Sequence, residues 1–267
     1  MSQSLDLPPT IQFTQAGPVA TIRLNDPASM NALSLDMIVG LQNALGVAQK
    51  NARALVLAGS PRAFSSGANL GTGMGLDQPS ADRDAGTVLE SHINPLMVAL
   101  RDLTIPWVSA VRGAAAGVGC SLALAADLIV AGDSAYFLQA FRRIGLVPDG
   151  GSTYLLTKAV GRVRAMEMML LGEKIPAAKA LEWGMINRLV ADEAVEDAAQ
   201  ALAAELADGP TRALALIRKN AWLATSGDFE AVLQAERTGQ AAAGRTADFR
   251  EGVAAFRDKR PARFTGA

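Results

Sequence analysis

The chain has 267 residues, of which 50% are hydrophobic and 19% are charged, a composition typical of a protein with a large buried core. Its 25 Lys and Arg residues against 26 Asp and Glu residues give a net charge of −1, which excludes a strong field toward nucleic acid or an anionic membrane. One cysteine, Cys120, excludes an internal disulfide, and the single histidine, His92, leaves no cluster of soft metal ligands. The sequence therefore predicts no metal site, and a chemistry that uses carboxylates, hydroxyls and backbone.

The first 60 residues predict two strands, a helix and a third strand. Residues 11–25 alternate in polarity around Gly17 and Pro18, which is typical of a hairpin. Residues 35–50 have apolar side chains at helical spacing behind Ser34, a residue type that favours a helix N-cap. Residues 53–59 form a short apolar run that predicts a buried strand.

Residues 62–83 are rich in Gly, Ser and Asn and predict a loop. The elements expected after it are a helix at about 85–103, a strand at 107–113, a helix from the glycine-rich turn near 117, and two extended pieces within 128–137. The chain from residue 150 onward is predicted to be almost wholly helical. We expect a strand-and-helix core over residues 1–200 and a helical region over residues 201–267.

The N-terminal residues contain no basic segment leading into an apolar run. No stretch reaches the roughly 18 apolar residues that a membrane-spanning helix needs. We therefore expect a cytoplasmic protein with no membrane partner.

One pattern suggests a nicotinamide-dependent dehydrogenase. Gly113, Gly117 and Gly119 lie between a predicted strand and helix, and Tyr154 and Lys158 have the Y-x-x-x-K spacing. In a doubly wound sheet, however, the nucleotide-binding turn follows the first strand. Because this glycine turn comes after several predicted strands, the spacing disfavours that function.

Two loops can direct backbone N–H groups toward a ligand oxygen. The small residues 65–68 allow close approach of the backbone, although the same loop could be an ordinary surface turn. At the second loop, residues near Gly117 and Val118 begin a helix, where the first N–H groups have no intrahelical acceptor and the helix dipole is positive. The alternative for this second loop is close packing of the helix.

Asp149 is the only carboxylate in the segment 144–153, which reads IGLVPDGGST. It could remove a proton from a substrate, or it could cap the following helix. The apolar run from Ile144 to Val147 is expected to desolvate the carboxylate and raise its pKa, which would make it a stronger base near neutral pH.

Together with the segment NDPASMNALS at 25–34 and the tail FRDKRPARF at 256–264, these features resemble the crotonase, or enoyl-CoA hydratase/isomerase, superfamily. The resemblance implies an α/β fold, a spiral of β-β-α units followed by a helical C-terminal trimerisation region. It also implies a homotrimer or a dimer of trimers. The implied substrate is an acyl-CoA thioester, with no other cofactor.

The resemblance also implies roles for individual residues. The backbone N–H groups of Ala68 and Val118 would stabilise an enolate of the thioester, each contributing about 3 kcal/mol in the transition state. Lys259 would reach the nucleotide phosphates of CoA, from the same or a neighbouring subunit. The residues implied to lie along the CoA are Arg62, Ala63, Phe64 and Leu70.

The sequence departs from the typical hydratases of this superfamily at their two glutamates, whose positions hold Ser121 and Phe141. The segment 136–153 is most similar to the branch of ring-epoxide isomerases that act on phenylacetyl-CoA derivatives. The resemblance therefore implies an isomerase in which Asp149 is the acid-base residue, since one base suffices to move a proton between two carbons. The alternatives are a 2-enoyl-CoA hydratase with unusual groups and an inactive acyl-CoA-binding protein.

Overall fold

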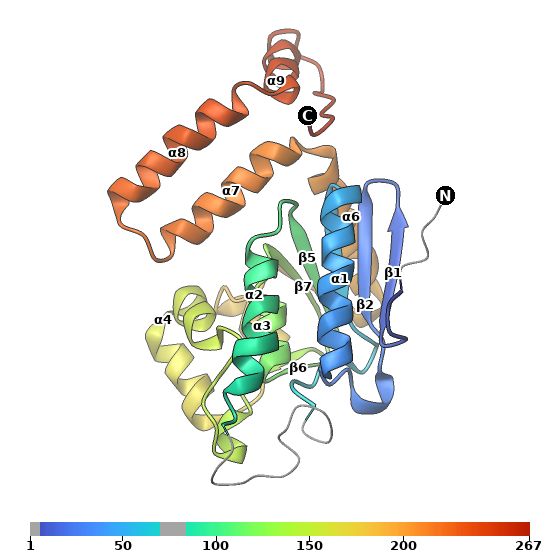
Figure 1. Ribbon diagram of the computed structural model, residues 1–267, viewed down its shortest axis with the longest axis vertical. Coiled ribbons are helices and arrows are strands. Elements are labelled where there is room, and N and C mark those ends of the chain that lie inside the picture. The colour runs from blue at the N-terminus through green and yellow to red at the C-terminus, as the bar shows by residue number, and fades with distance from the viewer. Residues whose placement is uncertain (1–5, 70–83) are drawn as a thin grey trace.

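The computed structural model of the protein describes residues 6–69 and 84–267 (Figure 1). Its larger sheet has six strands in the order β1-β2-β3-β5-β7-β10, and only the first pair is antiparallel. These strands are β1 (Ile11–Ala16), β2 (Val19–Leu24), β3 (Ala54–Ala58), β5 (Trp107–Val111), β7 (Leu128–Gly132) and β10 (Arg188–Val190).

A smaller sheet has the order β4-β6-β8-β9, with its first three strands parallel. Its strands are β4 (Ala63–Ser65), β6 (Ala114–Ala116), β8 (Tyr136–Leu138) and β9 (Ile175–Pro176). The sequence predicted a loop at β4 and a turn at β6. Both strands are three residues long and consist mainly of small side chains, so their polarity does not alternate as a strand pattern requires.

The helices are α1 (Leu35–Asn51), the π-helical segment η2 (Leu89–Ile93), α2 (Asn94–Arg101), α3 (Val118–Leu124), α4 (Ser152–Leu171), α5 (Ala177–Glu182), α6 (Val195–Asp208), α7 (Thr211–Ala224), α8 (Phe229–Ala243) and α9 (Ala247–Arg257). Three short 3₁₀ helices are η1 (Pro27–Ser29), η3 (Phe141–Ile144) and η4 (Asp192–Ala194). In the described part of the chain, no helix combines the length and the apolar character that crossing a membrane requires.

The predicted opening of two strands, a helix and a strand is confirmed. Gly17 has a φ of +57° in the hairpin turn, and the Ser34 hydroxyl accepts a hydrogen bond of 3.2 Å from the Met37 N–H at the start of α1. The predicted division at residue 200 falls within α6, which packs against β3 and β5 of the larger sheet.

The central strands β3 and β5 of the larger sheet are buried on both faces. Leu55 and Leu57 of β3 belong to the core shared with α1, whereas Val56 belongs to a second core shared with α6. Successive side chains of a strand point to opposite faces, so both sets of β3 residues are covered. This explains why the run ALVLA reads as continuously apolar.

Helices α7, α8 and α9 extend from the sheets at one end of the molecule (Figure 1). Arg53, which directly precedes β3, holds this region by donating hydrogen bonds to the Thr211 hydroxyl, the Gly209 carbonyl and the Phe264 carbonyl. The C-terminal helices are therefore tied to the sheet through their first turn and through the end of the chain.

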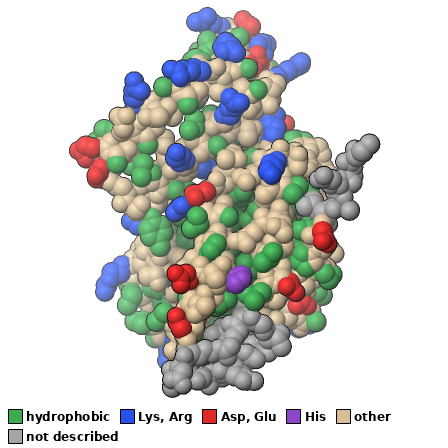
Figure 2. Space-filling model, viewed as in Figure 1, with side chains coloured by type: hydrophobic (Ala, Val, Ile, Leu, Met, Phe, Trp, Pro, Cys, Tyr) green, Lys and Arg blue, Asp and Glu red, His purple; other side chains and the backbone are tan. Residues whose placement is uncertain are grey.

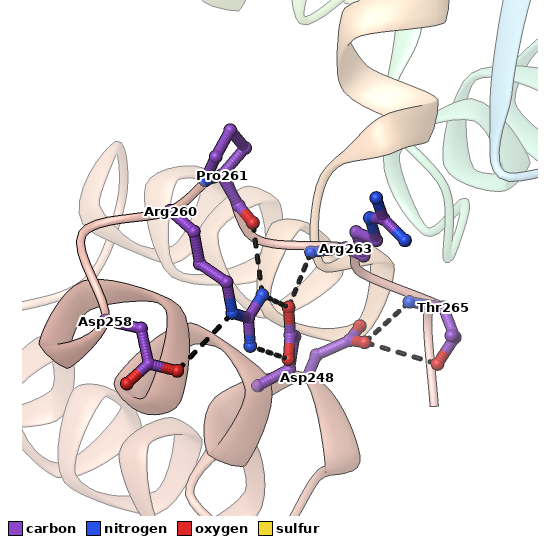
Figure 3. Close-up of polar contacts among 7 residues, drawn as sticks. Asp248, Asp258, Arg260, Pro261, Arg263 and Thr265 are labelled. Carbon is purple, nitrogen blue, oxygen red and sulfur yellow. Dashed lines mark hydrogen bonds and ion pairs between the residues drawn. The ribbon is translucent and has the colours of Figure 1, made fainter.

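The last residues fold back onto α9 (Figure 3). The buried Asp248 carboxylate accepts hydrogen bonds from the N–H groups of Thr265 and Gly266, at 2.7 and 2.8 Å. Arg260 makes a bidentate ion pair with Glu251, at 2.7 and 2.9 Å. The tail therefore has a fixed course beside α9.

Candidate active site

The loop after β4 has its Ala68 N–H free of the sheet ladder. Ala68 forms an isolated parallel bridge with Leu33, whose N–H donates to the Gly67 carbonyl at 2.7 Å and whose carbonyl accepts from the Asn69 N–H at 3.0 Å. In a parallel bridge, the bonds on either side of a residue leave its own N–H directed the other way. The Ala68 N–H is thus available on the opposite side of this loop.

The helix α3 begins directly after Gly117, whose φ of +52° and ψ of −131° suit only glycine. The Gly117 N–H donates to the Leu138 carbonyl at 2.8 Å, which fixes the turn to β8. Val118 is the first helical residue, so its N–H has no intrahelical acceptor. This group is the second available backbone donor.

The two loops are in contact through glycines. A Cβ atom on Gly67 would lie 2.9 Å from the Ala116 carbonyl oxygen, and one on Gly117 would lie 3.7 Å from the Gly67 Cα. A larger residue at position 67 would push the loops apart, and its φ of +106° would also strain such a residue. The structure therefore brings together the two backbone segments that carry Ala68 and Val118.

The turn that carries Asp149 packs on α3. A Cβ atom on Gly150 would meet the Val118 side chain at 2.9 Å and the Ser121 hydroxyl at 3.2 Å. The Ser121 hydroxyl donates to the Asp149 main-chain carbonyl at 3.0 Å and pairs with the Ser152 hydroxyl, and both serine side chains are fully buried. Asp149 is thus held next to the helix that supplies the Val118 donor.

The Asp149 carboxylate is half-buried, and its Oδ1 atom has no hydrogen-bond partner in the described part of the chain. Burial raises its pKa from 3.8 to about 6, because no donor compensates for the loss of water around the charge. A carboxylate in this environment is a base suited to near-neutral pH.

The structure decides one alternative and corrects one expectation about Asp149. Its side chain does not cap α4: the N-cap is Gly151, and the Ser152 N–H donates to the Asp149 main-chain carbonyl instead. The rise in pKa is confirmed, but the apolar run does not enclose the carboxylate, since Ile144 and Val147 are 53% and 77% exposed. The turn is buried against α3 rather than by its own preceding residues.

Neither of the two positions that hold glutamates in typical hydratases offers an acid here. Ser121 is occupied with the Asp149 and Ser152 contacts, and the Phe141 ring lies against Gly117, where a Cβ atom would be 3.8 Å from Cζ. The sequence did not predict the Ser121–Ser152 pair, because nothing in the spacing of two serines 31 residues apart indicates contact.

The residues expected along the CoA differ in exposure. Arg62 is exposed, whereas the side chains of Ala63 and Phe64 are fully buried in the core, so only their main chain could meet a ligand. Leu70 lies outside the described residues. Lys259 follows α9 with a left-handed φ of +53°.

Lys259 follows α9 closely, since that helix ends at Arg257. In Figure 1, α9 lies at the far end of the C-terminal helices, beyond α7 and α8, whereas β6 and α3 lie in the body of the molecule. Lys and Arg side chains are prominent over the C-terminal helices in Figure 2, which is the end of the chain that carries Lys259.

Tyr154 and Lys158, which have the Y-x-x-x-K spacing of a dehydrogenase, make packing contacts between helices in this structure. The Tyr154 ring stacks on Trp222, with 6.4 Å between ring centroids, and its hydroxyl pairs with Thr225. Lys158 lies over the Tyr154 ring at 5.8 Å. These contacts join α4 to α7.

Two further residues that the sequence analysis considered are Cys120 and His92. Cys120 is fully buried, and burial raises the pKa of its thiol to about 12. His92 accepts or donates a 2.7 Å hydrogen bond with the Ser91 hydroxyl. Across residues 6–69 and 84–267, no three His, Cys, Asp or Glu side chains are grouped so that they could hold a metal ion.

Comparisons with known proteins agree on a single family. The profile of the family described as enoyl-CoA hydratase/isomerase matches residues 14–267. A Rhodobacter capsulatus protein named "Probable enoyl-CoA hydratase" is 45% identical, over 96% of this chain and 98% of its own. The 1,2-epoxyphenylacetyl-CoA isomerase of Escherichia coli K12 is 41% identical, over 93% and 95%.

The same family is found among solved structures. The enoyl-CoA hydratase subunit I of Geobacillus kaustophilus superposes with a TM-score of 0.88 at 33% identity, covering 97% of this chain and 98% of its own. Its fold is the crotonase fold that the sequence predicted. The chain therefore belongs to the enoyl-CoA hydratase/isomerase family of enzymes.

Proposed function

We propose that this enzyme isomerises acyl-CoA thioesters, shifting a double bond or rearranging a ring-derived acyl group through an enolate. The observation that carries the proposal is the Asp149 carboxylate, which is desolvated and lies beside the helix that supplies the Val118 N–H. One of its oxygens has no hydrogen-bond partner among the residues that the structure describes.

The proposed mechanism uses two backbone donors and one base. The thioester oxygen accepts hydrogen bonds from the Ala68 and Val118 N–H groups, which stabilise the negative charge that develops on it. Asp149 removes a proton from one carbon of the acyl group to give the enolate, and then returns the proton to another carbon. No net proton or electron is gained or lost, so one carboxylate completes the cycle.

Hydration would require a second group to hold and activate water. The described residues of the two loops, α3 and the Asp149 turn contain one carboxylate, Asp149, with Ser121 and Phe141 at the positions of the hydratase glutamates. The similarity to an isomerase of a ring-derived CoA ester supports the same choice. Hydration of a 2-enoyl-CoA is the second candidate function, because the Rhodobacter capsulatus relative is named a probable enoyl-CoA hydratase.

The CoA itself needs contacts beyond the thioester. We infer that Arg62, together with main-chain groups of Ala63 and Phe64, lies along the CoA. Because Lys259 follows α9, which lies beyond α7 and α8 from the body of the molecule, it would serve the site of a neighbouring subunit. This role fits assembly as a homotrimer or a dimer of trimers in the cytoplasm.

Turnover of three substrates tests the function. The enzyme is incubated with a 3-enoyl-CoA, with crotonyl-CoA and with a ring-epoxide of phenylacetyl-CoA, and double-bond position and water addition are followed by NMR. We expect rearrangement of the first or third substrate. Rapid hydration of crotonyl-CoA would establish the hydratase instead, and tight binding without turnover of any thioester would indicate a binding protein.

Activity should depend on pH through Asp149. Because the base must be ionised and its pKa is about 6, kcat/KM should rise about tenfold per pH unit below this value and level off above it. The pH profile of kcat/KM for the best substrate is the measurement. A profile that is flat between about pH 5 and pH 8 would remove Asp149 from the role of base.

Ser121→Ala should lower kcat about fivefold to tenfold and leave KM within about twofold, because it removes one hydrogen bond that fixes the Asp149 carbonyl. Ser109→Ala is the matched control, since Ser109 is equally buried in the sheet but its hydroxyl has no hydrogen-bond partner among the described residues. Equal kinetic effects of the two substitutions would contradict a positioning role for Ser121.

A further inference from the structure

Asn31 is a fully buried polar residue that the proposed mechanism does not use. It has a left-handed φ of +55°, which asparagine tolerates better than most residues. Its N–H donates to the Asp26 carbonyl at 2.8 Å, and its side-chain oxygen Oδ1 accepts from the Asp26 N–H at 2.7 Å. These two hydrogen bonds close the turn around η1 and fix the position of Asn31.

The side-chain amide of Asn31 joins this turn to β4. Its Nδ2 atom donates to the Ala63 carbonyl at 2.8 Å and to the Phe64 carbonyl at 3.2 Å. Breaking such buried contacts leaves polar groups unpaired away from water, so they favour one arrangement of the two segments. Because β4 leads directly into the loop of Ala68, Asn31 holds the start of that loop.

Ser65 continues these contacts from Asn31 into the loop itself. The fully buried Ser65 hydroxyl donates to the Asn31 main-chain carbonyl at 2.8 Å and accepts from the Gly67 N–H at 3.2 Å. Gly67 directly precedes Ala68. The hydroxyl therefore fixes the residue next to the first proposed backbone donor.

Ser65 also lies against the helix that supplies the second donor. A Cβ atom on Gly119 would be 2.7 Å from both the Cβ and the hydroxyl oxygen of Ser65, so α3 packs directly on this serine. Val118 immediately precedes Gly119. Ser65 thus contacts both backbone segments that carry the proposed donors. The neighbouring Ser66 hydroxyl donates to the Ser29 carbonyl at 3.0 Å instead.

We propose that Asn31 and Ser65 are positioning residues that set the distance between the Ala68 and Val118 N–H groups. The inference rests on the proposed function, because it assumes that these N–H groups bind the thioester oxygen. Two donors stabilise the charge on that oxygen only where both lie within hydrogen-bond distance of it. A displacement of about 1 Å can cost about 100-fold in rate. Loss of the serine hydroxyl should therefore weaken stabilisation of the enolate without removing either donor.

Ser65→Ala removes both hydrogen bonds of the hydroxyl and keeps the Cβ atom that packs on Gly119. We expect kcat for the best acyl-CoA substrate to fall about 10-fold to 30-fold, with KM within about twofold of wild type. Ser66→Ala is the matched control, because it removes one hydroxyl hydrogen bond from the same loop without changing the contacts of Asn31 or Gly67. Its kcat should stay within about twofold of wild type.

Infrared difference spectra of bound butyryl-CoA, isotopically labelled at the thioester carbonyl, give a readout that a loss of stability alone does not move. Hydrogen bonds from the two donors weaken the C=O bond, so binding to the wild type should lower its stretching frequency. Ser65→Ala should reduce that lowering, and Ser66→Ala should preserve it.

Asn31→Gly removes the side-chain amide and keeps a residue that adopts the same φ. It should also reduce the lowering of the carbonyl frequency. The double variant Asn31→Gly/Ser65→Ala should lower kcat by less than the product of the two single effects, because both residues act through one chain of contacts. If Asn31→Gly does not fold, Ser65→Ala alone decides the inference.

The spectra separate the failure of this inference from failure of the proposed function. If the carbonyl frequency responds as expected but no thioester is isomerised, the positioning roles stand and the proposed function is wrong. Isomerisation by the wild type, with unchanged kcat and carbonyl frequency in Ser65→Ala, would overturn the positioning roles alone. Equal losses in Ser65→Ala and Ser66→Ala would overturn them too, since they would report a general disturbance of the loop. So would a wild-type complex without any lowering of the carbonyl frequency.

Discussion

Asp149→Asn should lower kcat by about 10²- to 10⁴-fold while leaving the affinity for saturated acyl-CoA within about twofold. The amide keeps the volume of the carboxylate but accepts no proton at neutral pH. The Ala68 and Val118 donors act through backbone and remain in place. Steady-state kinetics and calorimetric binding of butyryl-CoA provide the two readouts. Residual activity above about a tenth of wild type would mean that another group is the base.

The same variant has a second expected effect, which shows whether the fold survives. The folded-state pKa of Asp149, about 6, is above its ordinary value of 3.8, so the folded protein holds the proton more tightly than the unfolded chain. Stability from this group is present at low pH and is lost as pH rises from about 4 to about 6.

Asparagine removes that loss because it does not ionise. The variant should therefore be more stable than wild type at about pH 8, by about 1 to 3 kcal/mol after allowance for partial exposure, with little difference at about pH 4. A variant that is inactive and less stable at pH 8 would instead indicate that the turn itself was disturbed. Loss of activity with a gain of stability is typical of a strained functional group.

The sequence predicted the order of the larger elements because their signals are local. The alternation around Gly17 and the Ser34 cap each depend on neighbouring residues, and both appear as expected. The three-residue strands β4 and β6 are set instead by contacts between distant segments, such as Ala114 pairing with Ala63. No local pattern could have indicated them.

The site was predictable where the resemblance or backbone chemistry supplied the residue. The small residues predicted close approach of the backbone to a ligand, and the contact of the two loops through Gly67 and Gly117 appears only in the structure. The burial of Phe64 and the anchoring of Asp149 by Ser121 were not predicted, because both depend on tertiary packing. Sequence alone therefore singled out Asp149 as the candidate base but did not predict how its main chain is held.

One buried arginine makes several of the contacts between α7 and the core. The Arg218 side chain is 5% exposed and forms an ion pair of 2.5 Å with Asp127, which also accepts a hydrogen bond from the Trp107 N–H. Arg218 donates as well to the main-chain carbonyls of Leu100 and Leu103, at the end of α2. One side chain thus satisfies groups from α2 and from the segment before β7.

Arg218→Ala should lower the free energy of unfolding by about 3 to 5 kcal/mol, because it leaves the Asp127 charge buried without its partner and two carbonyls without a donor. Burial already raises the pKa of Asp127 despite the arginine, so its remaining charge would be more costly still. Urea unfolding followed by tryptophan fluorescence measures the change, and Trp222 on α7 reports on this helix. Arg212→Ala removes an exposed arginine of the same helix, and its free energy of unfolding should stay within about 0.5 kcal/mol of wild type.

Adding Asp127→Asn to Arg218→Ala should restore part of the lost stability, since the amide removes the unpaired charge and still accepts a hydrogen bond from the Trp107 N–H. Strictly additive losses in the double variant would contradict the assignment of the effect to the stranded carboxylate.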